Sequence, residues 1–271
     1  MNRACWVMAG CYARWALQSP FALFATAGMV AYTALTTSDD IAMIIHQGEQ
    51  LSALEALLAV FNNGVYLTYG LFFPFMFIIF PMFYAKDLER LMAYRAYRRG
   101  DFWTARLLAI LQVTCLFLGI AVTLVAGAVA LNFPLSLRWS EDFIRLVLDA
   151  APAGSGYLYI FTYYLPLSVA AQQAILLCMS FVLVGVLGAL LVQFIDRQMV
   201  AFLAVSAYWV VALVRDSVPG VLVRASPLTH LFMSERTPEF SFAHSFLYFA
   251  GALVLFTLAG NARAQNTNVG G

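Results

Sequence analysis

The segment from Lys86 to Arg106 concentrates charge in a chain of 271 residues of which only 11% are charged. It holds six basic and three acidic residues within 21 positions, between two long apolar runs. Loops rich in Lys and Arg between membrane spans remain on the cytoplasmic side. The apolar residues Leu88, Leu91 and Met92 fall on one stripe, which predicts a short amphipathic helix. We therefore expect a docking surface for a soluble partner; the alternative is a solvated loop that only sets the topology.

The charged side chains of this segment are the candidate docking residues. Opposite charges that meet across a buried interface can contribute strongly to binding, whereas charges at its rim contribute little. The residues assigned to this surface are Asp87, Glu89, Arg90, Arg95, Arg98, Arg99 and Asp101.

The sequence lacks the motifs of the common catalytic sites. A phosphate-binding loop needs a lysine after its glycine-rich cradle, and the only lysine, Lys86, follows F-P-M-F-Y-A, which contains no glycine. Neither H-E-x-x-H nor G-x-S-x-G occurs, and the four cysteines form no C-x-x-C pair. We therefore predict no catalytic site, metal or cofactor in this chain. If ATP drives the protein, ATP and Mg²⁺ bind to another polypeptide.

The composition is that of an integral membrane protein. Hydrophobic residues make up 63% of the chain, against about 45–50% in soluble domains. With a net charge of +1 and no basic face outside the loops, nucleic acid is excluded as a partner. We predict an all-α fold in a single transmembrane domain, 1–271, with an interfacial helix at 1–18 and a coupling region at 86–106. Six spans are expected at about 20–37, 65–85, 107–131, 168–194, 199–214 and 244–260.

The distribution of charge predicts how these spans are oriented. With six spans, both termini lie on the side of the 86–106 segment, where ten of the 15 basic residues fall. The positive-inside rule makes this side cytoplasmic, so the protein is expected in a prokaryotic inner or plasma membrane. A signal peptide is the competing interpretation of the N-terminus. The segments 38–63 and 132–166 and the proline-rich 215–242, which should form broken helices, are expected outside.

Few strongly polar residues lie within the predicted spans. None of the spans carries an ionisable residue near its middle, which argues against a carrier driven by protons or sodium. The polar exceptions are Gln112 and Thr114 in the third span and Gln172 and Gln173 in the fourth. They either line a translocation path or form hydrogen bonds between neighbouring helices.

Several of these features together resemble the permease subunits of type V ABC exporters. In that family an acidic residue follows the second span, where this chain has Asp87 and Glu89, and a motif ending in an aromatic-rich, basic stretch adjoins the coupling helix. Residues 99–106, R-G-D-F-W-T-A-R, fit the second half of that motif. The first half differs, since Ala96 and Arg98 stand where the family has proline and serine. Residues 226–232, S-P-L-T-H-L-F, resemble the stretch that precedes the last span.

The resemblance implies a permease that exports its substrate with energy from a separate ATPase. It implies two cytoplasmic ABC ATPase subunits, a second permease copy or a paralogue, and surrounding membrane lipid as partners. The apolar spans favour an amphipathic or hydrophobic cargo; a peptide is preferred, with a lipid or drug as alternatives. A different class of function stays open, namely a non-transporting scaffold or immunity-type protein that binds a cytoplasmic partner.

Overall fold

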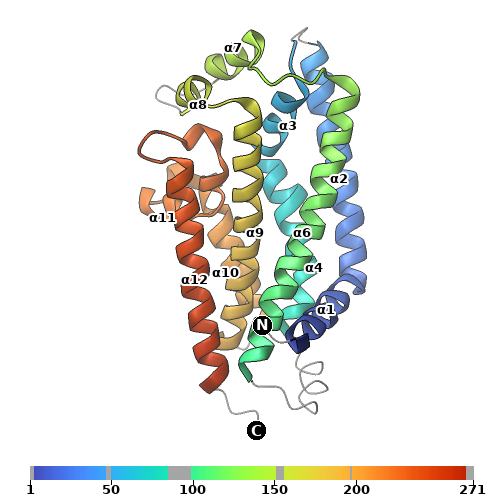
Figure 1. Ribbon diagram of the computed structural model, residues 1–271, viewed down its shortest axis with the longest axis vertical. Coiled ribbons are helices and arrows are strands. Elements are labelled where there is room, and N and C mark those ends of the chain that lie inside the picture. The colour runs from blue at the N-terminus through green and yellow to red at the C-terminus, as the bar shows by residue number, and fades with distance from the viewer. Residues whose placement is uncertain (1–2, 47–49, 85–98, 151–155, 196, 267–271) are drawn as a thin grey trace.

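The computed structural model describes residues 3–46, 50–84, 99–150, 156–195 and 197–266. Within these ranges the chain is almost entirely helical and contains no β-strand. Its long helices run side by side in one elongated bundle (Figure 1). Helices α7 and α8 lie at one end, here called the α7 end, and helix α1 lies at the other, the α1 end.

Six helices of the described chain are long and apolar enough to cross a membrane. The predicted all-α fold with six spans is thereby confirmed, and the protein is a multi-pass membrane protein. Four spans are single helices: α2 (Pro20–His46) is the first, α6 (Arg99–Asn132) the third, α9 (Pro166–Ile195) the fourth and α12 (Phe242–Asn266) the sixth. The second span is an interrupted helix made of η1 (Tyr66–Phe72), α4 (Phe73–Ile79) and η2 (Phe80–Tyr84). In the fifth span, α10 (Gln198–Val210) runs into η3 (Val211–Ser217).

The N-terminal helix α1 (Arg3–Leu17) packs across the base of the bundle against α6. It buries Met8 and Tyr12 and leaves Trp6 and Trp15 about half exposed. This division into one buried and one exposed apolar face is typical of a helix at a membrane interface. The hydroxyl of Ser19 accepts a hydrogen bond from the amide of Ala22 at 3.1 Å, which caps the start of α2.

Aromatic side chains fill the centre of the bundle. The rings of Phe72 and Trp209 stack with centroids 4.6 Å apart, and Phe181 packs edge-on against both Phe75 and Trp209. The second span changes its winding around Pro74 and Pro81, from a π-helical turn to an α-helix and then to a 3₁₀ turn. Proline in a helix removes a backbone hydrogen bond and displaces the preceding turn, which accounts for the interruption.

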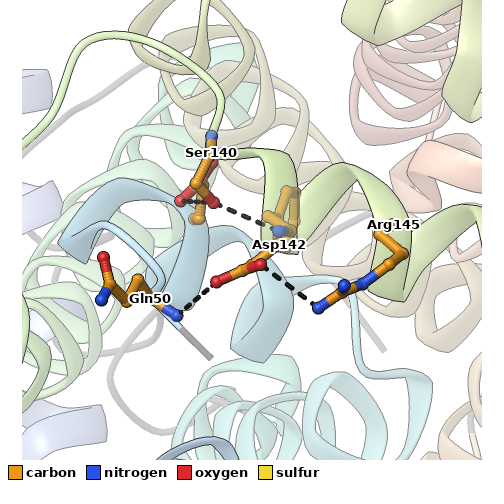
Figure 2. A network of polar contacts seen from close by, with 6 residues as sticks. Gln50, Ser140, Asp142 and Arg145 are labelled. Carbon is orange, nitrogen blue, oxygen red and sulfur yellow. Dashed lines mark hydrogen bonds and ion pairs between the residues drawn. The ribbon is translucent and has the colours of Figure 1, made fainter. Parts of the chain in front are cut away.

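At the α7 end, short helices and polar contacts close the bundle. Helix α3 (Ala53–Phe61) packs between the spans, while α7 (Glu141–Ala150) and α8 (Tyr157–Tyr163) lie above them. Figure 2 shows Asp142 between two partners: it accepts the backbone amide of Gln50 at 2.9 Å and pairs with Arg145 at 3.2 Å. The loop before α3 and the start of α7 are therefore tied together.

The segment between α10 and α12 is broken into short helices, as the prolines predicted. It comprises η3, α11 (Gly220–Ala225), η4 (Thr229–Leu231) and η5 (Met233–Glu235). Residues 226–231 are buried, and the Ser226 hydroxyl donates to the carbonyl of Trp209 within the fifth span at 2.9 Å. The chain thus turns back into the bundle instead of passing over its end; we call residues 218–236 the re-entrant segment.

Candidate functional sites

Most of the predicted coupling surface cannot be placed. Asp87, Glu89, Arg90, Arg95 and Arg98 lie outside the described residues. Arg99 is the first residue of α6, and the position of its side chain is not described. Asp101 lies in the first turn of α6 and is partly buried. Asp101 therefore marks the place where this surface joins the bundle.

The first turns of α6 are attached to two other helices. Trp103 is buried, and its indole Nε1 donates to the carbonyl of Thr257 in α12 at 3.1 Å. Its ring rests on Gly260, where a Cβ atom would overlap the indole. Three residues further along, the buried guanidinium of Arg106 lies 5.7 Å from the ring centroid of Tyr12 in α1. A displacement of the start of α6 would therefore also displace α1 and α12.

Helix α6 begins within the predicted coupling region 86–106. Its stretch that is long and apolar enough to cross a membrane starts at Asp101. Trp103, Ala105 and Arg106, in the first turns of this helix, are buried. Arginine at such a position carries its charge to the protein interior, where an aromatic face can partly compensate for lost water.

The four predicted path residues occupy two separate places. Thr114 is fully buried in α6, and its hydroxyl has no hydrogen-bond partner in the described chain. Gln112, two residues earlier and on a different face of the helix, is partly exposed. Gln172 and Gln173 lie in the first half of α9 and contact the re-entrant segment. The structure does not join the two pairs through any hydrogen bond between described residues.

Gln173 is the centre of a buried polar cluster at the α7 end. Its amide nitrogen donates to the carbonyl of Leu231 at 2.7 Å and lies 3.4 Å from the carbonyl of Phe61. Its oxygen accepts a 2.6 Å hydrogen bond from the guanidinium of Arg236, which also donates to Gln172 at 3.3 Å. One side chain therefore joins α3, α9 and the re-entrant segment.

Arg236 is an unusual member of this cluster because it is only 3% exposed. No carboxylate among the described residues pairs with it, and its Nε has no hydrogen-bond partner there. Burial lowers the pKa of its guanidinium to about 10, so the group is a cation at neutral pH. Burying a cation against neutral amides costs free energy. The burial of Arg236 in this cluster consequently lowers the free energy of unfolding.

The helix α8 is fixed to the same segment by backbone and side-chain contacts. The amide of Gly156 donates to the carbonyl of Ser234 at 2.8 Å. Asn62 bridges from the end of α3, donating to the Tyr157 hydroxyl and accepting the amide of Met233, both at 2.7 Å. Burial raises the pKa of Tyr157, so its hydroxyl stays protonated and can donate a hydrogen bond while it accepts the one from Asn62.

A pocket of about 440 Å³ lies beside this cluster. Asn62, Tyr157 and Thr229 contribute polar atoms to its wall. Two oppositely charged side chains of the wall, Arg215 and Glu235, form an ion pair of 2.9 Å between η3 and η5. The pocket therefore combines a largely apolar wall with polar groups and one ion pair.

His230 and Ser245 form a buried pair that resembles a catalytic dyad in composition. The His230 Nδ1 lies 3.1 Å from the Ser245 hydroxyl, and its Nε2 lies 3.0 Å from the carbonyl of Arg224. A carbonyl can only accept, so Nε2 carries the proton and Nδ1 accepts from serine. The His230 ring stacks on Tyr248. His230 is 2% exposed, and Ser245 is fully buried. The pair fastens the re-entrant segment to α12, and a substrate has no access to it.

Sequence reasoning identified Gln172, Gln173 and the broken helices between the last two spans, but it missed two residues that hold the α7 end together. Arg236 was counted only as one basic residue of an outer segment, and nothing in the surrounding S-E-R-T-P indicates burial. Glu55 was likewise counted only as one acidic residue of the outer segment 38–63. Its place three positions after Ser52 is a capping-box signal that would have fixed its local role.

A comparison with known proteins found no matching family model, no similar curated protein and no similar solved structure. Among the described residues, no group of three or more His, Cys, Asp or Glu side chains could hold a metal ion.

Proposed function

We propose that this chain is the permease half of an exporter whose energy comes from a separately encoded ATPase. The observation that carries the proposal is the re-entrant segment between the fifth and sixth spans. It contains the S-P-L-T-H-L-F stretch that resembles the family, and its residues contact three spans through Gln173, Trp209 and Ser245. A gate at the far side of a transporter needs such attachments, because it has to respond to movements of several helices.

The attachment of α6 supports the same proposal at the opposite end. A partner that pushes on the segment 86–98 would act directly on the start of α6, which Trp103 joins to α12. Helix α12 begins beside the re-entrant segment, to which Ser245 is bonded. Movement at the α1 end can thus reach the α7 end along one continuous helix, as coupling between ATP hydrolysis and a distant gate requires.

The proposed exporter contains at least two copies of this chain or a paralogue. The rings of Phe72, Phe75, Phe181 and Trp209 fill the centre of the bundle, so one copy leaves no room for cargo along its axis. A path would form between two bundles, whose facing surfaces are mainly apolar. Such a path suits an amphipathic peptide first, and a lipid or a hydrophobic drug next.

The filled centre also favours a second candidate, a scaffold or immunity-type protein that binds a cytoplasmic partner without transport. The two functions differ in whether ATP hydrolysis moves a substrate. Charge reversal of Glu89 or Arg99 tests the coupling surface: each change should abolish ATP-dependent transport while membrane insertion is retained. Normal transport by both variants would place the docking surface elsewhere.

A further inference from the structure

A groove of about 590 Å³ runs between α2 and α6 in the half of these spans nearer the α7 end. The two helices lie side by side along one edge of the bundle (Figure 1). Both are candidate membrane spans, and α2 buries only 28% of its apolar stretch within the protein. The groove therefore opens sideways towards lipid, within the thickness of the membrane.

The wall of the groove is apolar over most of its length. Val30, Ala34 and Ile41 contribute from α2, and Leu124, Ala128 and Leu131 contribute from α6. Pockets of roughly 300–1,000 Å³ hold ligands of drug size. Inside a membrane, the apolar molecules of this size that are always present are the acyl chains of lipids.

Four polar residues line the groove: Thr33, Thr37 and Ser38 from α2, and Asn132 from the end of α6. The Thr33 hydroxyl is already bonded to the hydroxyl of Tyr66. Thr37 lines the groove and is 2% exposed, and its hydroxyl has no hydrogen-bond partner in the described chain. Asn132 also lines it; its amide nitrogen donates to the carbonyl of Ala128 at 2.8 Å, which leaves its oxygen as an acceptor. A buried hydroxyl without a partner is costly, so a ligand that bonds to it gains affinity. Thr37 and Asn132 thus provide a donor and an acceptor in the wall of the groove.

The charges around the groove select against an ionised ligand. No charged side chain is among the residues that line it. Asp39 follows the lining residue Ser38 in α2 and is exposed, so it would repel a carboxylate or phosphate headgroup. A neutral headgroup with hydroxyls fits the available donor and acceptor better.

We propose that this groove binds one lipid with a single acyl chain and an uncharged hydroxylated headgroup, of which a monoacylglycerol is the simplest example. The acyl chain lies along Val30, Ala34 and Ala128, and the headgroup hydroxyls bond to Thr37 and Asn132. The site does not depend on the proposed transport function, because a resident lipid and a cargo lipid would occupy it alike.

The test uses the full chain in nanodiscs of saturated phosphatidylcholine, with a monoacylglycerol that carries a diazirine in its acyl chain. After irradiation, mass spectrometry of peptides should find the label concentrated on residues 30–42 and 124–132. Ala128→Phe fills the groove and should reduce this labelling at least about fivefold. Ala130→Phe is the matched control, since Ala130 is exposed on the same helix and does not line the groove.

Two further variants protect the test against misfolding and identify the polar contact. Ala34→Phe fills the groove from α2 at an exposed position, so a folded protein with reduced labelling is expected even if Ala128→Phe fails to fold. Thr37→Val should weaken labelling by the monoacylglycerol about fivefold, the effect of one hydrogen bond, and leave a diazirine-bearing alkane unaffected. Thr36→Val, outside the groove, is its control.

Three results would overturn the proposal. Label spread evenly over the exposed faces of α2, α9 and α12 would indicate ordinary surrounding lipid. Labelling by the corresponding fatty acid as strong as that by the monoacylglycerol would contradict the selection for a neutral headgroup. Absence of label together with an Ala34→Cys disulfide between two chains would show that a second copy covers the groove.

Discussion

The side chain of Glu55 provides the sharpest test of how the α7 end is built. It is 0% exposed, and its carboxylate accepts three hydrogen bonds. The amide of Ser52 donates at 2.7 Å within the capping box of α3, and Ser140 donates from its amide at 2.5 Å and from its hydroxyl at 2.9 Å. One carboxylate therefore fixes the start of α3 to the start of α7, 85 residues later.

Replacement of Glu55 by glutamine keeps the size of the side chain but presents an NH₂ group to at least one of these donors. Hydrogen bonds to a charged group contribute about 1.5–3 kcal/mol each, and a buried donor without a partner costs about 1–3 kcal/mol. Glu55→Gln should lower the free energy of unfolding by about 2 kcal/mol. Glu55→Ala, which removes all three acceptor contacts, should lower it by about 4 kcal/mol.

The measurement is unfolding of the purified protein in detergent by titration with SDS, followed by circular dichroism. Glu141→Gln is the matched control because Glu141 lies in the first turn of α7 and is exposed; its change should stay within about 0.5 kcal/mol. If Glu55→Gln and Glu141→Gln unfold at the same SDS fraction, the carboxylate does not hold the two helices together and the reasoning is refuted.

Three other predictions concern the re-entrant segment and the base of α6. Gly156→Ala should prevent α8 from docking, because the added Cβ would overlap the backbone carbonyl of Arg236; a protease would then cut near 151–156 faster than in the parent, and equal cutting would contradict this. Burial lowers the pKa of His230 to about 4, from 6.5 in the unfolded chain. Between these two values the unfolded state binds more protons than the folded state. The contribution of His230 to the free energy of unfolding should therefore be constant above pH 7 and fall by about 3 kcal/mol as the pH drops from 6.5 to 4. His230→Gln should remove this contribution to the pH dependence, and an unchanged profile would assign it to other groups. Gly260→Val should displace the Trp103 indole and shift its fluorescence to the red, whereas an unshifted spectrum would show that the indole does not rest on this glycine.

The course of the chain through the membrane could be predicted from the sequence because long apolar helices have few alternatives in lipid. Hydropathy located the six spans, and the change of winding in the second one coincides with Pro74 and Pro81. The prolines between 215 and 242 also indicated broken helices. That the segment turns inwards could not be read from them, since this depends on the contact of Ser226 with Trp209.

The polar cluster at the α7 end was beyond sequence reasoning for a different reason. Gln173 attracted notice because it is a strongly polar residue in an apolar span, but its partner Arg236 lies 63 positions away. Five arginines lie in the segments that were predicted to be outside. The path of the re-entrant segment decides which of them is buried, and no local sequence pattern encodes that path. The same is true of Glu55, whose second partner, Ser140, belongs to another helix.

The central claim, that this chain moves a substrate only when a separate ATPase drives it, is tested most directly by transport in proteoliposomes. The chain is reconstituted alone and together with the proposed ATPase partner, and uptake of a labelled amphipathic peptide is measured with and without ATP and Mg²⁺. We predict ATP-dependent transport only when both subunits are present, and its loss in the Glu89 and Arg99 charge reversals. ATP-dependent transport by this chain alone, or ATP hydrolysis by the complex that moves no peptide, lipid or drug, would contradict the claim.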